Sequence, residues 1–191
     1  MNRIEWDEKV KEIRPGSIVL VWGDSWLSKI IKWYQKWETG EDNTPSHVEM
    51  YWGGGDRMTV SAEWNGVRKM SLDRYFGTKH KLEVYHYKNL KVEEFQIMRA
   101  YNLGTVGRMY DYKGLLSFLS NIKVIYNLFK KKITPDDYMD FCSENCAAAY
   151  EQVEIKVAKK DKSGEINPAN IWQYIRDAVK WEKSYEYNNL A

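Results

Sequence analysis

The chain has 191 residues, a length that suits one compact domain and disfavours two full-sized domains. Its residues are 43% hydrophobic and 29% charged, which provides for a buried core and excludes a wholly disordered chain. The net charge is only +2, and acidic and basic residues alternate along most of the sequence. The composition therefore gives no indication of a nucleic-acid binder.

We expect a single domain over residues 1–191, with a charged leader at 1–13 and a polar tail at 182–191. Residues 1–11 lack the apolar stretch of a secretory signal, and no apolar run approaches the roughly 20 residues of a membrane span. The two cysteines are too few for a disulfide framework. These features favour a cytoplasmic protein without a transmembrane segment. They leave peripheral membrane association open and do not specify an oligomeric state.

Strand signals dominate the first half of the chain. Residues 17–22 (SIVLVW) follow a Pro-Gly turn and have the continuous apolar character of a buried strand. Over residues 26–37 the apolar residues recur at helical spacing, after a Gly-Asp-Ser segment that can cap a helix. Short aromatic and β-branched segments predict further strands at 47–52, 58–64 and 82–87, and the glycines between the first two predict a hairpin.

Helical signals dominate the second half. Helices are predicted over residues 92–103, 115–129 and 142–153, and from Pro168 to about Trp181. The helix over 115–129 is amphipathic and ends in three lysines, which suit a helix C-terminus. Because strands come first and helices later, the sequence indicates an α+β fold.

Only three histidines are available for catalysis or metal binding. His47 follows a turn and starts a predicted strand, where its ring can face a cleft. His80 lies in a charged loop that we expect to be exposed, and His86 lies inside a predicted strand. Position therefore favours His47 as the functional histidine.

Cys142 lies near the start of a predicted helix, after a segment that contains three aspartates. The unpaired N–H groups and the positive dipole end at such a position stabilise a thiolate, which is the attacking species. An N–H group of the same turn can also donate to a developing oxyanion. Cys146 follows one turn later in an alanine-rich stretch and is typical of a small buried side chain.

A zinc site could also be built from Cys142, Cys146 and a histidine, because three intervening residues are a permitted ligand spacing. The sequence contains no second close pair of such ligands. We therefore predict neither a metal nor another cofactor.

Several short segments follow one another in an informative order: PGSIVL at 15–20, SHV at 46–48, SAE at 61–63, GRMYD at 107–111 and FCSE at 141–144. This order resembles the circularly permuted papain-like branch of the NlpC/P60 superfamily, the YiiX/YaeF-like cysteine peptidases and amidases. The resemblance covers about residues 14–175. It implies a small antiparallel sheet or barrel packed against helices.

The resemblance also implies roles for individual residues. Cys142 would be the nucleophile, His47 the general base, Glu63 the residue that orients the histidine, and Tyr110 a residue that lines the oxyanion region. The chain departs from the family pattern at two places. Ser17 replaces an acidic residue after Pro-Gly, and Asn-Cys at 145–146 replaces Leu-Val after the CSE motif.

The predicted activity is cysteine-dependent hydrolysis of an amide or ester bond. The sequence does not choose between a peptide, a peptidoglycan fragment and an acyl or lipid-linked substrate, although its many tryptophans suit either an apolar groove or a core. Two non-enzymatic alternatives stay open. One is a catalytically inactive fold member that binds lipid or a protein partner. The other is a membrane-surface protein that uses residues 115–132 as an interfacial helix.

Overall fold

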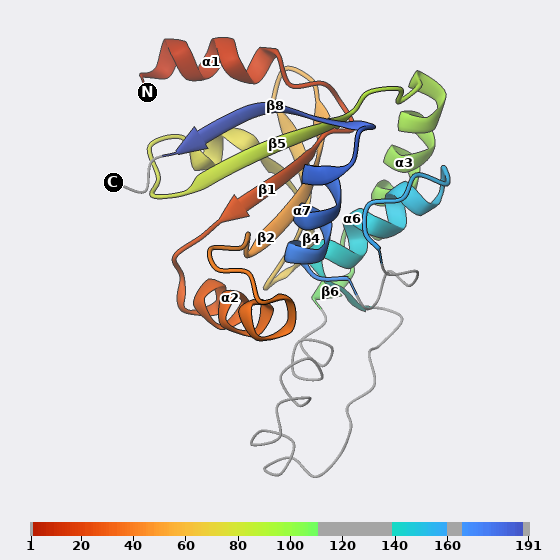
Figure 1. The fold of residues 1–191 in the computed structure, drawn as a ribbon. Coiled ribbons are helices and arrows are strands. Elements are labelled where there is room, and N and C mark those ends of the chain that lie inside the picture. Colours follow the sequence, from red (N-terminus) through yellow and green to blue (C-terminus); the bar gives the residue numbers. More distant parts are fainter. Residues whose placement is uncertain (1, 111–138, 160–165, 189–191) are drawn as a thin grey trace.

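The chain forms an open, six-stranded antiparallel sheet covered by helices, in a computed structural model that describes residues 2–110, 139–159 and 166–188 (Figure 1). The strand order is β4-β3-β2-β1-β5-β8, and every pair of neighbours is antiparallel. The strands are β1 (Ile18–Trp22), β2 (His47–Gly53), β3 (Met58–Glu63), β4 (Gly66–Ser71), β5 (Lys81–Tyr87) and β8 (Trp181–Asn188). The α+β prediction is confirmed, and the sheet is not closed into a barrel.

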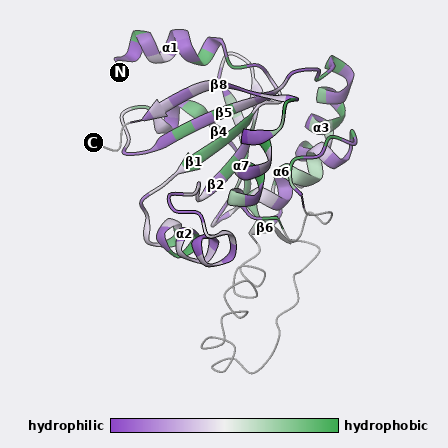
Figure 2. Cartoon of the chain, viewed as in Figure 1, coloured by the Kyte–Doolittle hydropathy of each residue, from purple (hydrophilic) through white to green (hydrophobic). Residues whose placement is uncertain are grey.

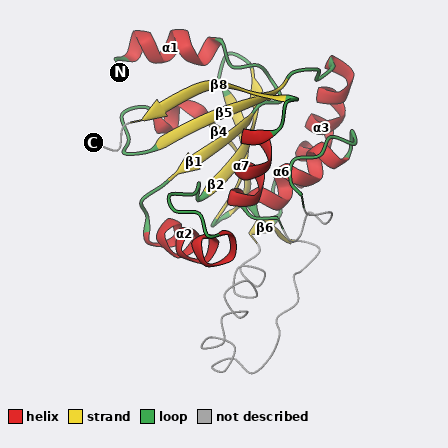
Figure 3. Cartoon of the chain, in the orientation of Figure 1, coloured by secondary structure: helices red, strands yellow, loops and turns green. Residues whose placement is uncertain are grey.

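Helices cover both faces of the sheet (Figure 3). Helices α3 (Val92–Thr105), α6 (Cys142–Glu151) and α7 (Pro168–Asp177) pack on one face. Helix α1 (Arg3–Lys11) and the 3₁₀ helix η1 (Leu72–Tyr75) pack on the other. Helix α2 (Trp26–Thr39) follows β1, and two short parallel strands, β6 (Met109–Tyr110) and β7 (Met139–Asp140), lie before α6.

The central strand β1 is buried along its whole length because both of its faces are covered. Ile18, Leu20 and Trp22 belong to the core under α3, α6 and α7, whereas Val19 and Val21 belong to the core under α1. This alternation is the period of two expected of a strand. The hydropathy colouring follows the same pattern, because α1 is mostly hydrophilic and hydrophobic residues gather in the central strands (Figure 2).

The predicted strands at 17–22, 47–52, 58–64 and 82–87 and the helices at 26–37, 92–103 and 142–153 are confirmed, with bounds shifted by at most a few residues. The hairpin between β2 and β3 is also confirmed. The predicted helix over 115–129 lies outside the described residues. Within those residues, no helix is long and apolar enough to cross a membrane.

Both chain ends differ from the expectation. The charged leader contains α1, whose Trp6 is fully buried and donates from Nε1 to Asp73 at 2.7 Å. The last predicted helix ends earlier than expected, at Asp177, and Trp181 together with residues 182–188 of the polar tail forms β8. In β8 the buried Tyr185 and Tyr187 alternate with exposed residues, a strand pattern hidden in a charged sequence.

Candidate active site

Helix α6 begins at Cys142, directly after Phe141, whose backbone is extended with φ −81° and ψ 159°. The thiol therefore lies in the first turn, close to the unpaired N–H groups and the positive end of the helix dipole. Cys142 is 5% exposed. The hydroxyl of the next residue, Ser143, donates to the carbonyl oxygen of Ile166 at 2.6 Å and fixes this end of the helix.

Asn145 and Cys146, which follow the CSE motif, have different environments. Asn145 accepts a hydrogen bond from the amide of Asn102 and donates one to the hydroxyl of Thr105, each at 2.9 Å, so it joins α6 to α3. Cys146 is 2% exposed, and burial raises the pKa of its thiol far above the usual range. Of the two cysteines, Cys146 is therefore the one held as an unreactive neutral thiol.

His47 is the first residue of β2, and hydrogen bonds from the residue before it fix its position. The Ser46 N–H donates to the carbonyl oxygen of Val21 at 2.9 Å, and the Ser46 hydroxyl accepts from the Gly23 N–H at 3.1 Å. The His47 side chain is only 18% exposed. The ring is thus held at one end of the sheet, between the strand and the start of α6.

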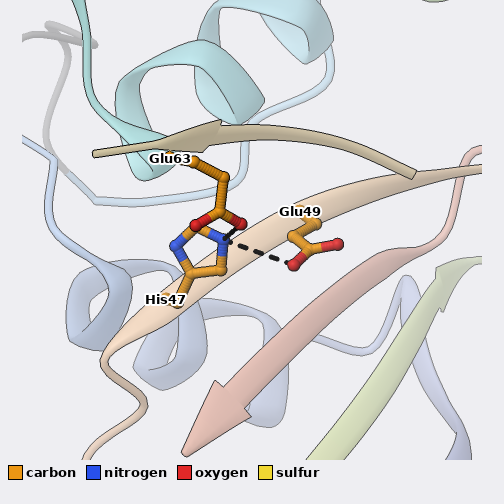
Figure 4. A group of neighbouring side chains, drawn as sticks. All are labelled: His47, Glu49 and Glu63. Atoms are coloured by element: carbon orange, nitrogen blue, oxygen red, sulfur yellow. Dashed lines mark ion pairs between the residues drawn. The ribbon is translucent and has the colours of Figure 1, made fainter. Parts of the chain in front are cut away.

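Two carboxylates face one nitrogen of this ring (Figure 4), and a hydroxyl approaches the same nitrogen. His47 Nε2 lies 2.6 Å from Ser61 Oγ, 3.3 Å from Glu49 Oε1 and 3.6 Å from Glu63 Oε1. The Ser61 hydroxyl also lies 2.8 Å from Glu63 Oε1. Ser61 therefore links the ring to Glu63, whereas Glu49 approaches the ring directly.

Arg74 and Tyr75, from η1, complete the charge balance of this group. The Arg74 guanidinium contacts Glu49 and lies 2.8 Å from Glu63 Oε1. It also donates to the Tyr75 hydroxyl at 2.8 Å, and that hydroxyl donates to Glu49. One arginine thus holds both carboxylates that face the histidine.

The pKa values of the group shift in the directions that this geometry dictates. Burial alone would raise the pKa of Glu49, but Arg74 and His47 more than offset it and bring that pKa to about 2. Burial would also raise the pKa of Glu63, but the charges of His47 and Arg74 outweigh this effect and lower that pKa. Burial would lower the pKa of His47, but a hydrogen bond and charge from Cys142, with Glu49 and Glu63, raise it well above its usual range. The arrangement favours an imidazolium at His47, next to Cys142.

The structure thus brings together three of the four residues that the sequence singled out: Cys142, His47 and Glu63. The backbone of the fourth, Tyr110, lies in β6 and pairs with Asp140 of β7, two residues before Cys142. Its side chain lies outside the described part of the structure, so its oxyanion role stays a prediction.

Sequence reasoning missed the roles of Ser61, Glu49 and Arg74. The sequence contained a signal for Ser61 and Glu49, because residues two apart in a strand lie on the same face of the sheet. Glu49 follows His47 at that spacing, and Ser61 precedes Glu63 at the same spacing. Arg74 comes from a 3₁₀ helix in another part of the chain, and no local pattern connects it to the histidine.

A pocket of about 370 Å³ opens beside the histidine. Its walls include His47, Glu63 and Arg74 on the sheet side and Leu27 and Ile31 of α2 on the other. Cys142 does not line this pocket. The pocket therefore gives access to His47 and Cys142 from the side of the histidine.

His80 also lines this pocket and is half-buried, not exposed as its charged loop suggested. Its Nδ1 lies 2.8 Å from the Thr78 hydroxyl. Burial lowers the pKa of His80, so a neutral imidazole lies at the pocket wall.

Three potential ligand atoms, from His47, Glu49 and Glu63, lie within 4.8 Å of one another, which is close enough to share a metal ion. However, Arg74 already contacts both carboxylates, and Tyr75 donates to Glu49. A divalent cation would place its charge beside a buried guanidinium. As arranged here, the cluster does not fit a resident metal.

No protein-family model matches the sequence, and a search of curated proteins finds no match. The structure is similar to the crystal structure of the metalloprotein yiiX from Escherichia coli O157:H7 (DUF1105), with a TM-score of 0.60 and 18% sequence identity. The similarity covers 93% of this chain and 99% of that one. At this identity the comparison establishes a YiiX-like fold.

Proposed function

We propose that the protein is a cysteine-dependent hydrolase of amide or ester bonds, with Cys142 as the nucleophile and His47 as the general base. The observation that carries the proposal is the environment of the imidazole. It interacts with the thiol of a helix N-terminal cysteine and, through Nε2, with Ser61 and two carboxylates. This is the nucleophile–base–orienting group arrangement that activates a thiol.

The reaction would proceed in two covalent steps. Because Nε2 faces Ser61 and Glu49, Nδ1 is the ring nitrogen left to accept the Cys142 proton. The thiolate attacks the substrate carbonyl carbon to form a C–S bond, and N–H groups at the start of α6 donate to the oxyanion. The imidazolium then protonates the leaving amine or alcohol as the acyl bond breaks. A water molecule, deprotonated by His47, cleaves the thioester and restores the thiol.

The YiiX-like fold supports the motif resemblance to the permuted branch of the NlpC/P60 superfamily. Peptides, peptidoglycan fragments and acyl or lipid-linked compounds are the substrate classes that this assignment suggests. The pocket combines apolar walls from α2 with polar groups near His47, and therefore suits a substrate with an apolar part next to the scissile bond.

A metal-dependent activity is the competing proposal, because the similar yiiX structure is named a metalloprotein and three ligand atoms meet at His47. The position of Arg74 between both carboxylates argues against it.

A thiol-directed activity probe tests the proposal against the inactive-binder alternative. Wild type should be labelled at neutral pH, and labelling should fall to background in Cys142→Ala and fall strongly in His47→Ala. Cys146→Ala is the matched control, because it removes the other buried thiol of the same helix and should keep labelling. Equal labelling of Cys142→Ala and wild type would refute the assignment of the nucleophile. An unreactive wild-type Cys142 would favour the inactive binder.

A further inference from the structure

Helix α2 exposes three tryptophans on one side. Trp26, Trp33 and Trp37 are 72%, 55% and 62% exposed. They are spaced seven and four residues apart, and at 3.6 residues per turn these spacings place them in one row along the helix. Ile30, four residues after the first, lies in the same row. Large aromatic side chains seldom form such a row in contact with water, because burying them is strongly favourable.

The other side of α2 is fixed to the protein. Tyr34 is 8% exposed and Gln35 is fully buried. The Gln35 side-chain oxygen accepts a hydrogen bond from the hydroxyl of Thr44, which lies in the loop after the helix, at 2.7 Å. The tryptophan row therefore lies on a helix whose opposite side is packed against the protein.

A row of lysines lies beside the tryptophan row. Lys29, Lys32 and Lys36 are spaced three and four residues apart, so they too follow one line along the helix. Lys32 Nζ donates to the carbonyl oxygen of Gly23, and Lys36 pairs with Asp42 at 2.6 Å. Lys29 is exposed.

The acidic residues near the end of the helix are held by partners within the protein. Glu38 accepts from Asn167 at 2.5 Å, and Glu41 lies 3.6 Å from Arg176. Arg176 thus partly compensates the charge of Glu41, and Lys36 and Asp42 compensate each other, so Lys29 and Lys32 are the cations beside the tryptophan row.

We propose that the tryptophan face of α2 docks on an anionic lipid bilayer. Indole rings have an apolar body and one N–H donor, and tryptophans accordingly concentrate at membrane–water interfaces. An amphipathic helix with aromatic residues on one side and lysines next to them suits the boundary between acyl chains and negatively charged headgroups. Three exposed tryptophans spread along one helix favour a lipid surface over a pocket-bound ligand.

Docking in this way would bring the candidate active site to the interface. Leu27, Ser28 and Ile31 of the same helix line the pocket beside His47. A bilayer against the outer side of α2 would therefore lie next to the pocket mouth, where Trp64 is 67% exposed. This consequence rests on the proposed function, whereas the docking itself does not.

Vesicle sedimentation tests the docking independently of catalysis, in a Cys142→Ala background that cannot turn over lipid. The protein should co-sediment with vesicles of phosphatidylcholine and phosphatidylglycerol, less with phosphatidylcholine alone, and less as salt rises. Replacing Trp26, Trp33 and Trp37 together by serine should lower the partition coefficient by at least about tenfold. Lys29→Glu should weaken binding to the anionic vesicles only.

A matched control removes equally exposed apolar side chains elsewhere. Val92→Ser with Val179→Ser changes residues that are 70% and 86% exposed, and should leave vesicle binding unchanged. Circular dichroism checks the fold of each variant. Absence of wild-type binding to anionic vesicles, or equal binding by the triple variant, would overturn the proposal. Tryptophan-dependent self-association without vesicle binding would overturn it in favour of a second copy of the chain.

The failures of the two proposals are distinguishable. A soluble ester or amide substrate and the thiol probe report on Cys142 and His47 without any membrane. Loss of vesicle binding with retained probe labelling would reject the docking surface alone, and the converse would reject the hydrolase alone.

Discussion

Glu49→Gln is the substitution that most directly tests the electrostatics of the site. The carboxylate is fully buried, contacts the guanidinium of Arg74, accepts from Tyr75 and lies 3.3 Å from His47 Nε2. Glutamine keeps the shape and a hydrogen-bonding oxygen but removes the negative charge. Arg74 would then retain only Glu63 as an anionic partner among the described residues.

The pKa of Glu49 gives the magnitude of the expected effect. A fall from 4.5 to about 2 corresponds to roughly 3 kcal/mol of folding stability at neutral pH. Because the folded pKa is the lower one, this contribution is complete above the unfolded value of 4.5 and is lost as the pH falls toward about 2. At pH 3 roughly 1 kcal/mol of it would remain.

Urea unfolding at pH 7 and pH 3 measures this difference. The gap in unfolding free energy between wild type and Glu49→Gln should be roughly 3 kcal/mol at pH 7 and smaller by roughly 2 kcal/mol at pH 3. Glu83→Gln is the control, because Glu83 is 4% exposed but pairs with Lys81 of its own strand, away from His47. A gap that does not change with pH would refute the coupling between Glu49 and its cations.

The remaining predictions concern the reactive groups. Limited iodoacetamide labelling at pH 7, mapped by mass spectrometry, should modify Cys142 much faster than Cys146, whose buried thiol has a raised pKa; preferential labelling of Cys146 would contradict the site. Ser61→Ala should lower kcat/KM by about tenfold and shift the pH profile of Cys142 alkylation, since the hydroxyl links His47 to Glu63; a folded variant with an unchanged profile would show that Ser61 is not a positioning residue. Cys142→Ala combined with His47→Ala should be no less active than either single variant, whereas multiplying losses would indicate independent roles. Treatment with a chelator should leave the labelling rate of Cys142 unchanged, and a loss restored by zinc would favour the metal-dependent alternative.

The sequence predicted most of the fold because its strands and helices carry strong local signals. The run at 17–22 is apolar throughout, and β1 is covered on both faces. The ends were harder to predict, because their burial depends on distant partners. The buried Trp6 donates a hydrogen bond to Asp73 and packs against Tyr187 of β8. Both partners are far away in the sequence, so no local pattern predicts these contacts.

In the candidate site, too, residues with a local sequence signal could be predicted and residues brought in by distant packing could not. Cys142 and His47 were accessible from the sequence, because a helix start and a strand start can be recognised locally. Glu63 came from the family resemblance, and the structure places it behind Ser61, which makes the shorter contact to the ring. Arg74 reaches the cluster only through the packing of η1 against the sheet, so its role required the fold.

His47, Glu49 and Glu63 have the composition of a metal site, but the contacts of Arg74 make them better suited to holding a proton on the histidine. Two carboxylates and one guanidinium leave one negative charge near the ring, and an imidazolium at His47 balances it. Cys142 then has a cationic imidazolium as a neighbour in addition to the helix N-terminus. A divalent cation would have to displace both the proton of His47 and the guanidinium from the carboxylates. The arginine therefore keeps both carboxylates ionised, and the negative charge that remains favours a protonated His47.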